Sequence, residues 1–232
     1  GSAAVAVDGH PVLEIHDSAL SHGLFGLYTA DTGSGTVFDD VRVSRCRSFV
    51  DDFETDWVGR WDYLGGNWRR LRGRGEEETD SWELRVASQG PAKAVTGERE
   101  WRNYTLSAAL GPVRAGRAGL LFCYLDSGNY YACRWRRDGD RLVGELIKVA
   151  DGSVTVLGRN EKELTVDPYT LRPSVCVDDG HIVVRADGET VLEAFDTAFA
   201  RGRVGLVADQ CESVSFDDVC VRFNPSAVLL LP

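Results

Sequence analysis

The stretch "NYYACRWRR" (129–137) carries residue types that could bind a polar ligand. Apolar and polar side chains alternate along it, as in a strand with one buried and one exposed face. Burying unpaired arginines would cost roughly several kcal/mol each, so Arg134 and Arg136 should face water together with Tyr130. These three side chains are the predicted ligand-binding residues, because they can stack on and hydrogen-bond a sugar or an acidic partner. The alternative is a solvated face without a ligand. The opposite set is expected to line the core: Tyr131, Cys133 and Trp135.

Residues for nucleophilic catalysis are scarce. The chain has no Gly-x-Ser-x-Gly elbow, and a cysteine nucleophile would need a histidine partner. Three of the four histidines lie in the first 45 residues: His10, His16 and His22, with His181 as the fourth. We therefore predict that the protein is not an enzyme.

The elements that position these residues are predicted to be short strands. Apolar and β-branched runs are separated by turn sequences such as "DSGN", "RDGD", "ADGS", "VDDG" and "ADGE", and Asp-Gly steps favour tight hairpins. No segment keeps a helical period beyond about two turns. The sequence predicts an all-β, antiparallel protein.

The overall charge limits the partners. The formal net charge of −10 argues against nucleic acid and anionic membrane surfaces as main partners. No apolar run approaches the roughly 20 residues that a membrane span needs.

The ending of the sequence occurs twice. Residues 3–45 align with residues 182–223 at an offset of 179, which becomes 178 after a single one-residue gap. Matches over so many positions indicate an internal repeat. The matching residues of the first copy are Val5, Val12, Leu13, Glu14, Asp17, Ala19, Gly23, Gly26, Leu27, Phe38, Asp39, Asp40, Val41 and Val43.

This repeat predicts the domain organisation. Residues 1–45 are interpreted as the tail of an upstream repeat, with Gly1-Ser2 as the remnant of a tag. Residues 46–224 form one complete domain, and residues 225–232 form a C-terminal tail. The apolar strand faces of 3–45 should not stay exposed. They are therefore expected to complete the sandwich, to dock on a sheet edge, or to form a strand-swapped homodimer.

Three motifs carry a resemblance to a known superfamily. The domain opens with "FVDDFETDW", has "GLLFCYLDSGNYY" at its centre and ends with "GRVGLVADQCESVSFDDVCV". It resembles the concanavalin A-like, laminin-G-like jelly-roll superfamily, in its bacterial extracellular form. The resemblance covers 46–224 and implies an antiparallel β-sandwich. The central motif usually has arginine where Cys123 stands, so any role of that arginine is absent here.

The resemblance also implies a metal site. Such folds often hold a structural Ca²⁺ where the first and last strands meet. Asp52 and Asp218 are the predicted ligands, completed by backbone carbonyls and water. The alternative is that the aspartates are ordinary strand ends.

Several functions fit this superfamily, which also includes glucanases. Their ExDxxE strand signature is missing here. We predict a secreted, periplasmic or cell-surface module for binding or adhesion, whose partner is a polysaccharide or glycoprotein. The alternatives are an accessory domain of a glycoside-processing enzyme and a structural spacer.

The six cysteines fit either an extracellular protein with some disulfides or buried free thiols. If "DSGN" closes as a two-residue turn, Phe122 should oppose Cys133, and Cys123 and Cys133 should point to opposite faces. A three-residue turn would instead bring the two cysteines opposite each other. Cys211 and Cys220 are both missing from the upstream copy, which suggests that they arrived together as a pair. Cys46 is the alternative partner, because it is expected to lie close to either of them.

Overall fold

The computed structural model describes residues 2–7, 10–16, 48–54, 60–72, 81–163 and 170–224. The chain divides into two compact units, Gly1–Ser44 and Arg45–Pro232. No helix occurs in the described ranges, and none there is long and apolar enough to cross a membrane.

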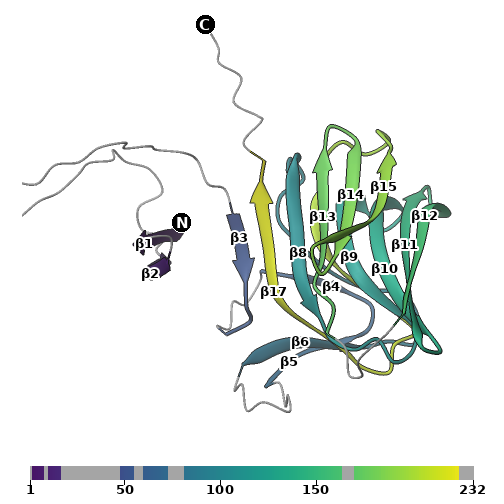
Figure 1. The fold of residues 1–232 in the computed structure, drawn as a ribbon, viewed down its shortest axis with the longest axis horizontal. Coiled ribbons are helices and arrows are strands. Elements are labelled where there is room, and N and C mark those ends of the chain that lie inside the picture. The colour runs from purple at the N-terminus through teal and green to yellow at the C-terminus, as the bar shows by residue number, and fades with distance from the viewer. Residues whose placement is uncertain are drawn as a thin grey trace, which may run out of the picture. The chain divides into compact units, whose positions relative to one another are not determined.

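The second unit is an antiparallel β-sandwich of two layers (Figure 1). The seven-stranded sheet has the order β12-β11-β10-β9-β16-β7-β4, and the eight-stranded sheet has the order β15-β14-β13-β8-β17-β6-β5, with β3 also paired to β17. The predicted fold class is therefore confirmed. The strands are β3 (Ser48–Asp51), β4 (Asp62–Leu64), β5 (Asn67–Arg72), β6 (Trp82–Ala87), β7 (Ala92–Thr96), β8 (Tyr104–Leu110), β9 (Arg117–Asp126), β10 (Asn129–Asp138), β11 (Arg141–Ala150), β12 (Ser153–Glu163), β13 (Pro173–Asp178), β14 (His181–Ala186), β15 (Glu189–Phe195), β16 (Arg203–Asp209) and β17 (Val214–Phe223).

Asp-Gly turns fix several of the hairpins. Both residues have positive φ at Asp151-Gly152, Asp179-Gly180 and Asp187-Gly188, as a type I′ turn requires. Aspartate tolerates this conformation better than most residues, and glycine adopts it without a steric penalty. The turns predicted from these dipeptides are present.

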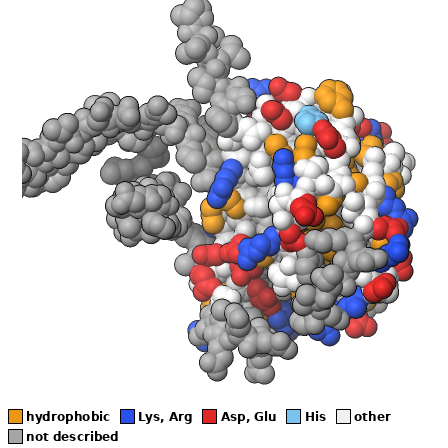
Figure 2. Space-filling view, in the orientation of Figure 1, with side chains coloured by type: hydrophobic (Ala, Val, Ile, Leu, Met, Phe, Trp, Pro, Cys, Tyr) orange, Lys and Arg blue, Asp and Glu red, His pale blue; other side chains and the backbone are white. Residues whose placement is uncertain are grey.

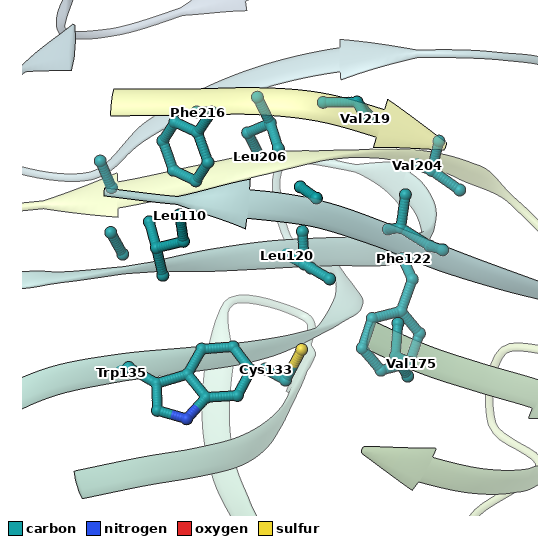
Figure 3. Packing of buried hydrophobic residues seen from close by; sticks show 14 of the residues in the cluster. Leu110, Leu120, Phe122, Cys133, Trp135, Val175, Val204, Leu206, Phe216 and Val219 are labelled. Carbon is teal, nitrogen blue, oxygen red and sulfur yellow. The ribbon is translucent and has the colours of Figure 1, made fainter. Parts of the chain in front are cut away.

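The core lies between the two sheets (Figure 3). Cys133 and Trp135 reach it from β10, and Phe216 and Val219 from β17. Tyr131 belongs to the same buried cluster, so the predicted core-facing set of β10 is correct. Fully burying one large apolar side chain contributes about 1.5–3 kcal/mol, which makes this cluster the main source of stability.

The turn after β9 is the predicted two-residue turn, because Asp126 pairs with Asn129. The predicted register beyond it is wrong: Cys133 opposes Leu120, not Phe122. The cause is a β-bulge at Cys123, whose φ is 46°. A bulge inserts residues into one strand and changes which face the next side chains occupy. Cys123 and Cys133 therefore both lie in the core.

The first unit contains one described hairpin, β1 (Ser2–Val7) and β2 (His10–His16). Shifted by the repeat offset of 179, these bounds coincide with those of β14 and β15. The register irregularity between Val5 and Ala6 also coincides with the one between Val184 and Arg185. The sequence repeat thus has a structural counterpart, while the rest of the proposed fragment, residues 17–45, lies outside the described residues.

Candidate functional site

A cleft of about 600 Å³ lies at the β4 edge of the seven-stranded sheet. It is lined from four strands and their connections by aromatic, acidic and basic side chains. The lining residues are Trp61, Asp62, Tyr63, Leu64, Val95, Arg99, Tyr124, Leu125, Asp126 and Arg203.

The bulge in β9 helps to build this cleft. It separates Phe122, which packs in the core, from Tyr124, which lines the cleft. The bulged backbone is held from two sides. The backbone N–H of Cys123 donates a hydrogen bond to the hydroxyl of Tyr104 (3.1 Å). Gly202 has a positive φ, and a Cβ there would lie 2.4 Å from the Cys123 carbonyl carbon, so only glycine fits.

Arg203 lies opposite Tyr124 in the β16–β9 pair and holds three groups of the cleft wall. Its guanidinium donates to the backbone carbonyls of Gly97 (3.1 Å) and Val95 (3.2 Å). It also forms a 2.7 Å ion pair with Asp62 on β4. The planar, five-donor guanidinium suits such a forked contact, so Arg203 fixes the edge strand to the sheet.

Asp126 provides an exposed carboxylate at the mouth of the β9–β10 turn. It accepts hydrogen bonds from the backbone N–H of Gly128 (2.8 Å) and from the side-chain amide of Asn129. These bonds, that of Gly128 first, lower the pKa of Asp126 below the usual aspartate value. The carboxylate is therefore ionised near neutral pH and acts as a hydrogen-bond acceptor.

Aromatic rings flank these polar groups. Tyr63 is 49% exposed, and its ring packs against Trp68 with centroids 5.8 Å apart. The ring of Tyr124 packs against Tyr130, with centroids 6.0 Å apart. Burial is the main cause that raises the pKa of Tyr124, so its hydroxyl remains protonated and can donate a hydrogen bond.

The predicted binding residues of β10 are only partly at this site. Tyr130 adjoins the cleft through Tyr124. Arg134 forms a 3.1 Å ion pair with Glu145, and Arg136 forms a 2.9 Å ion pair with Asp138. Arg134 does not simply face water, since its side chain is only 17% exposed.

The low exposure of Arg134 arises because the outer face of the seven-stranded sheet is not uniformly polar. A second apolar cluster covers it, built from Val95, Leu121, Tyr124, Ala132, Ile147, Val149 and Val207, with Tyr130 packed against them. Binding roles for Tyr130, Arg134 and Arg136 stay predictions.

Sequence reasoning missed Asp62, Tyr124, Asp126 and Arg203. The only local signal was the turn sequence "DSGN", in which the asparagine amide donates a hydrogen bond to the aspartate carboxylate. The bulge that brings Tyr124 to the cleft depends on Tyr104 and Gly202, which are distant in sequence. Alternation within one strand cannot reveal it.

The aspartates predicted to bind calcium lie near the β3–β17 pair. Val219 opposes Asp51, so Asp52 and Asp218 continue that register at the end of the pairing. Asp218 forms a 3.3 Å ion pair with Arg172. Among the described residues, no group of three or more His, Cys, Asp or Glu side chains is arranged to hold a metal ion. The described side chains alone do not make a metal site, and calcium binding stays a prediction.

A further carboxylate in this region is electrostatically unusual. Burial, followed by the nearby charges of Asp218, Asp52 and Glu54, raises the pKa of Asp217 to about 7. The backbone N–H of Asp218 donates to its carboxylate (2.7 Å).

The cysteines of the described ranges are free thiols: Cys123, Cys133, Cys176, Cys211 and Cys220. The hint of a Cys211–Cys220 pair is therefore wrong. Cys46 lies outside the described residues. Burial raises the pKa of Cys123 to about 11 and that of Cys133 to about 12, so both act as small apolar side chains.

No protein-family model and no curated protein matches the chain. Solved structures do match its fold. The carbohydrate-binding module CBM66 from Bacillus subtilis aligns with a TM-score of 0.59 and 17% identity, over 70% of this chain and 95% of that chain. A Bacillus subtilis protein of unknown function with a galectin-like fold aligns with a TM-score of 0.57 and 13% identity, over 78% and 97%.

A third similar structure belongs to a larger protein. The GH43 protein BlXynB from Bacillus licheniformis aligns with a TM-score of 0.53 and 18% identity, over 75% of this chain and 39% of that chain. Identities this low show a shared fold and no more. The chain shares the antiparallel jelly-roll β-sandwich fold of these structures.

Proposed function

We propose that this protein is a non-catalytic carbohydrate-binding module. The observation that carries the proposal is the cleft at the β4 edge, where Tyr63 and Tyr124 adjoin the charged groups of Asp62, Asp126 and Arg203. Ligand sites are typically concave, with apolar walls and a few placed polar groups.

The chemistry of this set suits a sugar. An aromatic face can pack against the C–H groups of a pyranose or furanose ring, and a tyrosine hydroxyl can also form hydrogen bonds with sugar hydroxyls. Ionised carboxylate and guanidinium groups form stronger, charge-assisted hydrogen bonds with sugar hydroxyls. Asp126 is held by its turn and Arg203 by two carbonyls, so little side-chain entropy is lost when a ligand binds.

The same groups are poorly suited to glycoside hydrolysis. A glycosidase needs one carboxyl group with a raised pKa to act as the acid. The pKa of Asp126 is lowered, and Asp62 is ion-paired with Arg203. This favours binding without hydrolysis.

The structural neighbours support the proposal and a second candidate. CBM66 is itself a carbohydrate-binding module, and the alignment spans 95% of it. BlXynB is a GH43 protein of which this fold makes up 39%, which favours an accessory domain of a glycoside-processing enzyme as the alternative. Both candidates imply an extracellular or cell-surface location. Adhesion to a glycoprotein would use the same cleft, whereas a structural spacer would leave it without a ligand.

The test is titration calorimetry with a panel of plant and bacterial polysaccharides and their oligosaccharides. We expect saturable binding of at least one glycan, weakened in Asp126→Asn and unchanged in Asp151→Asn, a control in another exposed turn. No binding across the panel would leave the spacer as the better interpretation. Release of reducing sugar by the wild-type protein would instead favour an enzyme.

We further propose that residues 3–45 contact a second copy of the chain. The proposal rests on the β1–β2 hairpin, whose bounds and register irregularity repeat those of β14–β15. Removal of residues 1–44, up to the boundary between the two units, should convert a dimer into a monomer in analytical ultracentrifugation. An unchanged oligomeric state and an unchanged stability would contradict the proposed contact between residues 3–45 and a second copy.

A further inference from the structure

Lys93 is a buried cation without an anionic partner. It lies on β7 and is only 8% exposed. Within the described residues, the one polar or ring contact of its ammonium group is with the ring of Tyr130, whose centroid lies 4.8 Å from the ammonium nitrogen. Burial lowers the pKa of Lys93, and no neighbouring charge opposes this effect. An unpaired buried ammonium is energetically unfavourable, so its presence calls for an explanation.

The position of Lys93 follows from the sheet register. Ala92 and Ala94 face the core, so Lys93 lies on the opposite face of the seven-stranded sheet. Tyr130 is on that face too, because Tyr131 faces the core. Strands β16 and β9 separate the two residues.

Lys93 and Tyr130 meet over β16 and β9, whose outer face alternates glycines with apolar side chains, and Val207 lies directly opposite Lys93. Gly205 on β16 and Gly119 on β9 belong to this outer face, by their pairing with Val95 and Arg134. The ammonium group of Lys93 reaches across these two strands to the ring of Tyr130. Around them lies the apolar cluster of Val95, Leu121, Tyr124, Ala132, Ile147, Val149 and Val207.

Other basic groups on this face already have partners. Arg134 is paired with Glu145, and Arg203 with Asp62. Both acidic groups are thus engaged elsewhere, and the charge of Lys93 remains uncompensated in an apolar setting. An anion that reached the ammonium would form a strong charge-assisted hydrogen bond there.

The site is continuous with the cleft. Tyr130 packs against Tyr124, which lines the cleft. Leu64, also in the cleft lining, pairs with Lys93 across β4 and β7. A ligand that extends from the cleft across the sheet would meet Tyr130 and Lys93 next.

We propose that Lys93 binds the carboxylate of an acidic sugar, in a polysaccharide whose neighbouring units occupy the cleft. This inference rests on the proposed carbohydrate-binding function and narrows its ligand class. The net charge of −10 opposes densely charged polyanions, so the preferred ligand is a neutral backbone that carries scattered uronate groups.

Glucuronoxylan and its carboxyl-reduced form are matched probes, because they differ only in the uronate carboxylate, which reduction converts to a neutral hydroxymethyl group. The wild-type protein should bind glucuronoxylan about tenfold or more tightly than the reduced polymer, as expected for one charge-assisted hydrogen bond. Lys93→Met should lose this preference and bind both polymers like the wild type binds the reduced one. Lys93→Arg should keep much of the preference for glucuronoxylan, because arginine retains the positive charge. Arg114→Met, which removes an exposed cation elsewhere, is the control for net charge and should keep the full preference.

A stability measurement separates binding from structure. Methionine keeps the apolar stem of Lys93 and removes a desolvated charge, so Lys93→Met should melt at the same temperature as the wild type or higher. Loss of the preference with retained stability supports the proposal. A marked fall in melting temperature would instead assign Lys93 a structural role and overturn it.

The two proposals fail in different ways. Equal binding of both polymers by wild type and Lys93→Met overturns the role of Lys93 and leaves carbohydrate binding intact. If neither polymer binds, the proposed role of Lys93 is also overturned. If no glycan of the wider panel binds either, the proposed carbohydrate-binding function is overturned as well.

Discussion

The buried hydroxyl of Tyr104 accepts a hydrogen bond from the backbone N–H of Cys123 across 3.1 Å. Tyr104 belongs to the eight-stranded sheet and Cys123 to the seven-stranded sheet, so this contact spans the sandwich. It satisfies a backbone group that the bulge removes from the ladder, and unpaired buried N–H groups are costly. A core residue thereby stabilises the strand conformation that shapes the cleft.

Replacing Tyr104 by Phe should therefore weaken both stability and binding. The Cys123 N–H would lose its partner, at a cost of about 1–3 kcal/mol in the free energy of unfolding. The bulge would shift, and glycan affinity should fall with it. Urea denaturation and calorimetric titration measure the two effects.

Tyr131→Phe is the matched control. It removes a buried hydroxyl that donates to Asp196 (2.5 Å) and does not hydrogen-bond the bulged backbone of Cys123. Stability should fall, while glycan affinity should stay at the wild-type level. If Tyr104→Phe and Tyr131→Phe reduced affinity equally, the bulge would have no special role.

Arg203→Lys should reduce glycan affinity about tenfold or more, in line with the loss of a charged hydrogen-bond network. Lysine keeps the charge but cannot contact Asp62 and the carbonyls of Val95 and Gly97 in one plane. Arg201→Lys is the control, because Arg201 is exposed and pairs with Glu100 outside the cleft. Equal affinities of the two variants in titration would argue against this role of Arg203.

Asp217 should make stability pH-dependent. Its pKa is about 7 in the folded protein against a usual value of 3.8, so the folded state holds the proton more tightly than the unfolded state. Stability therefore falls as pH rises from about 4 to 7, and the loss is complete above pH 7. Asp217→Asn should be more stable than the wild type at pH 8, by a margin that disappears near pH 4. Urea midpoints measured across this range would contradict the assignment if the margin were constant.

The ionisation of Asp217 also tests the predicted calcium site at Asp52 and Asp218. A bound cation would favour the ionised form of Asp217, so Ca²⁺ should raise the melting temperature and flatten the pH dependence of stability. Asp52→Asn should lose the response. An identical melting curve in EDTA and in Ca²⁺ would contradict the predicted site.

The sequence was sufficient for the parts of the fold that depend on local chemistry. Asp151-Gly152 and Asp187-Gly188 predict their hairpins because few other dipeptides tolerate positive φ twice. The alternation of Tyr131, Cys133 and Trp135 predicts the buried face of β10 because a strand has a period of two.

The cleft depends on contacts that no local pattern contains. Arg203 and Asp62 meet through the pairing of three strands, and Cys123 adopts its conformation because of Tyr104 and Gly202. The unpaired charge of Lys93 cannot be predicted from the sequence, because a single lysine in an apolar run does not reveal whether it has an anionic partner. Such features require the strand order and register.

The central claim is that the cleft binds carbohydrate through Tyr124 and its neighbours. The most direct measurement is calorimetric titration of the best glycan of the panel into wild type, Tyr124→Ala and Phe195→Ala. Phe195 is 73% exposed and outside the cleft lining, so it controls for the loss of an exposed aromatic ring. We predict strong loss of affinity in Tyr124→Ala and wild-type affinity in Phe195→Ala. Wild-type affinity in Tyr124→Ala would contradict the assignment of this cleft.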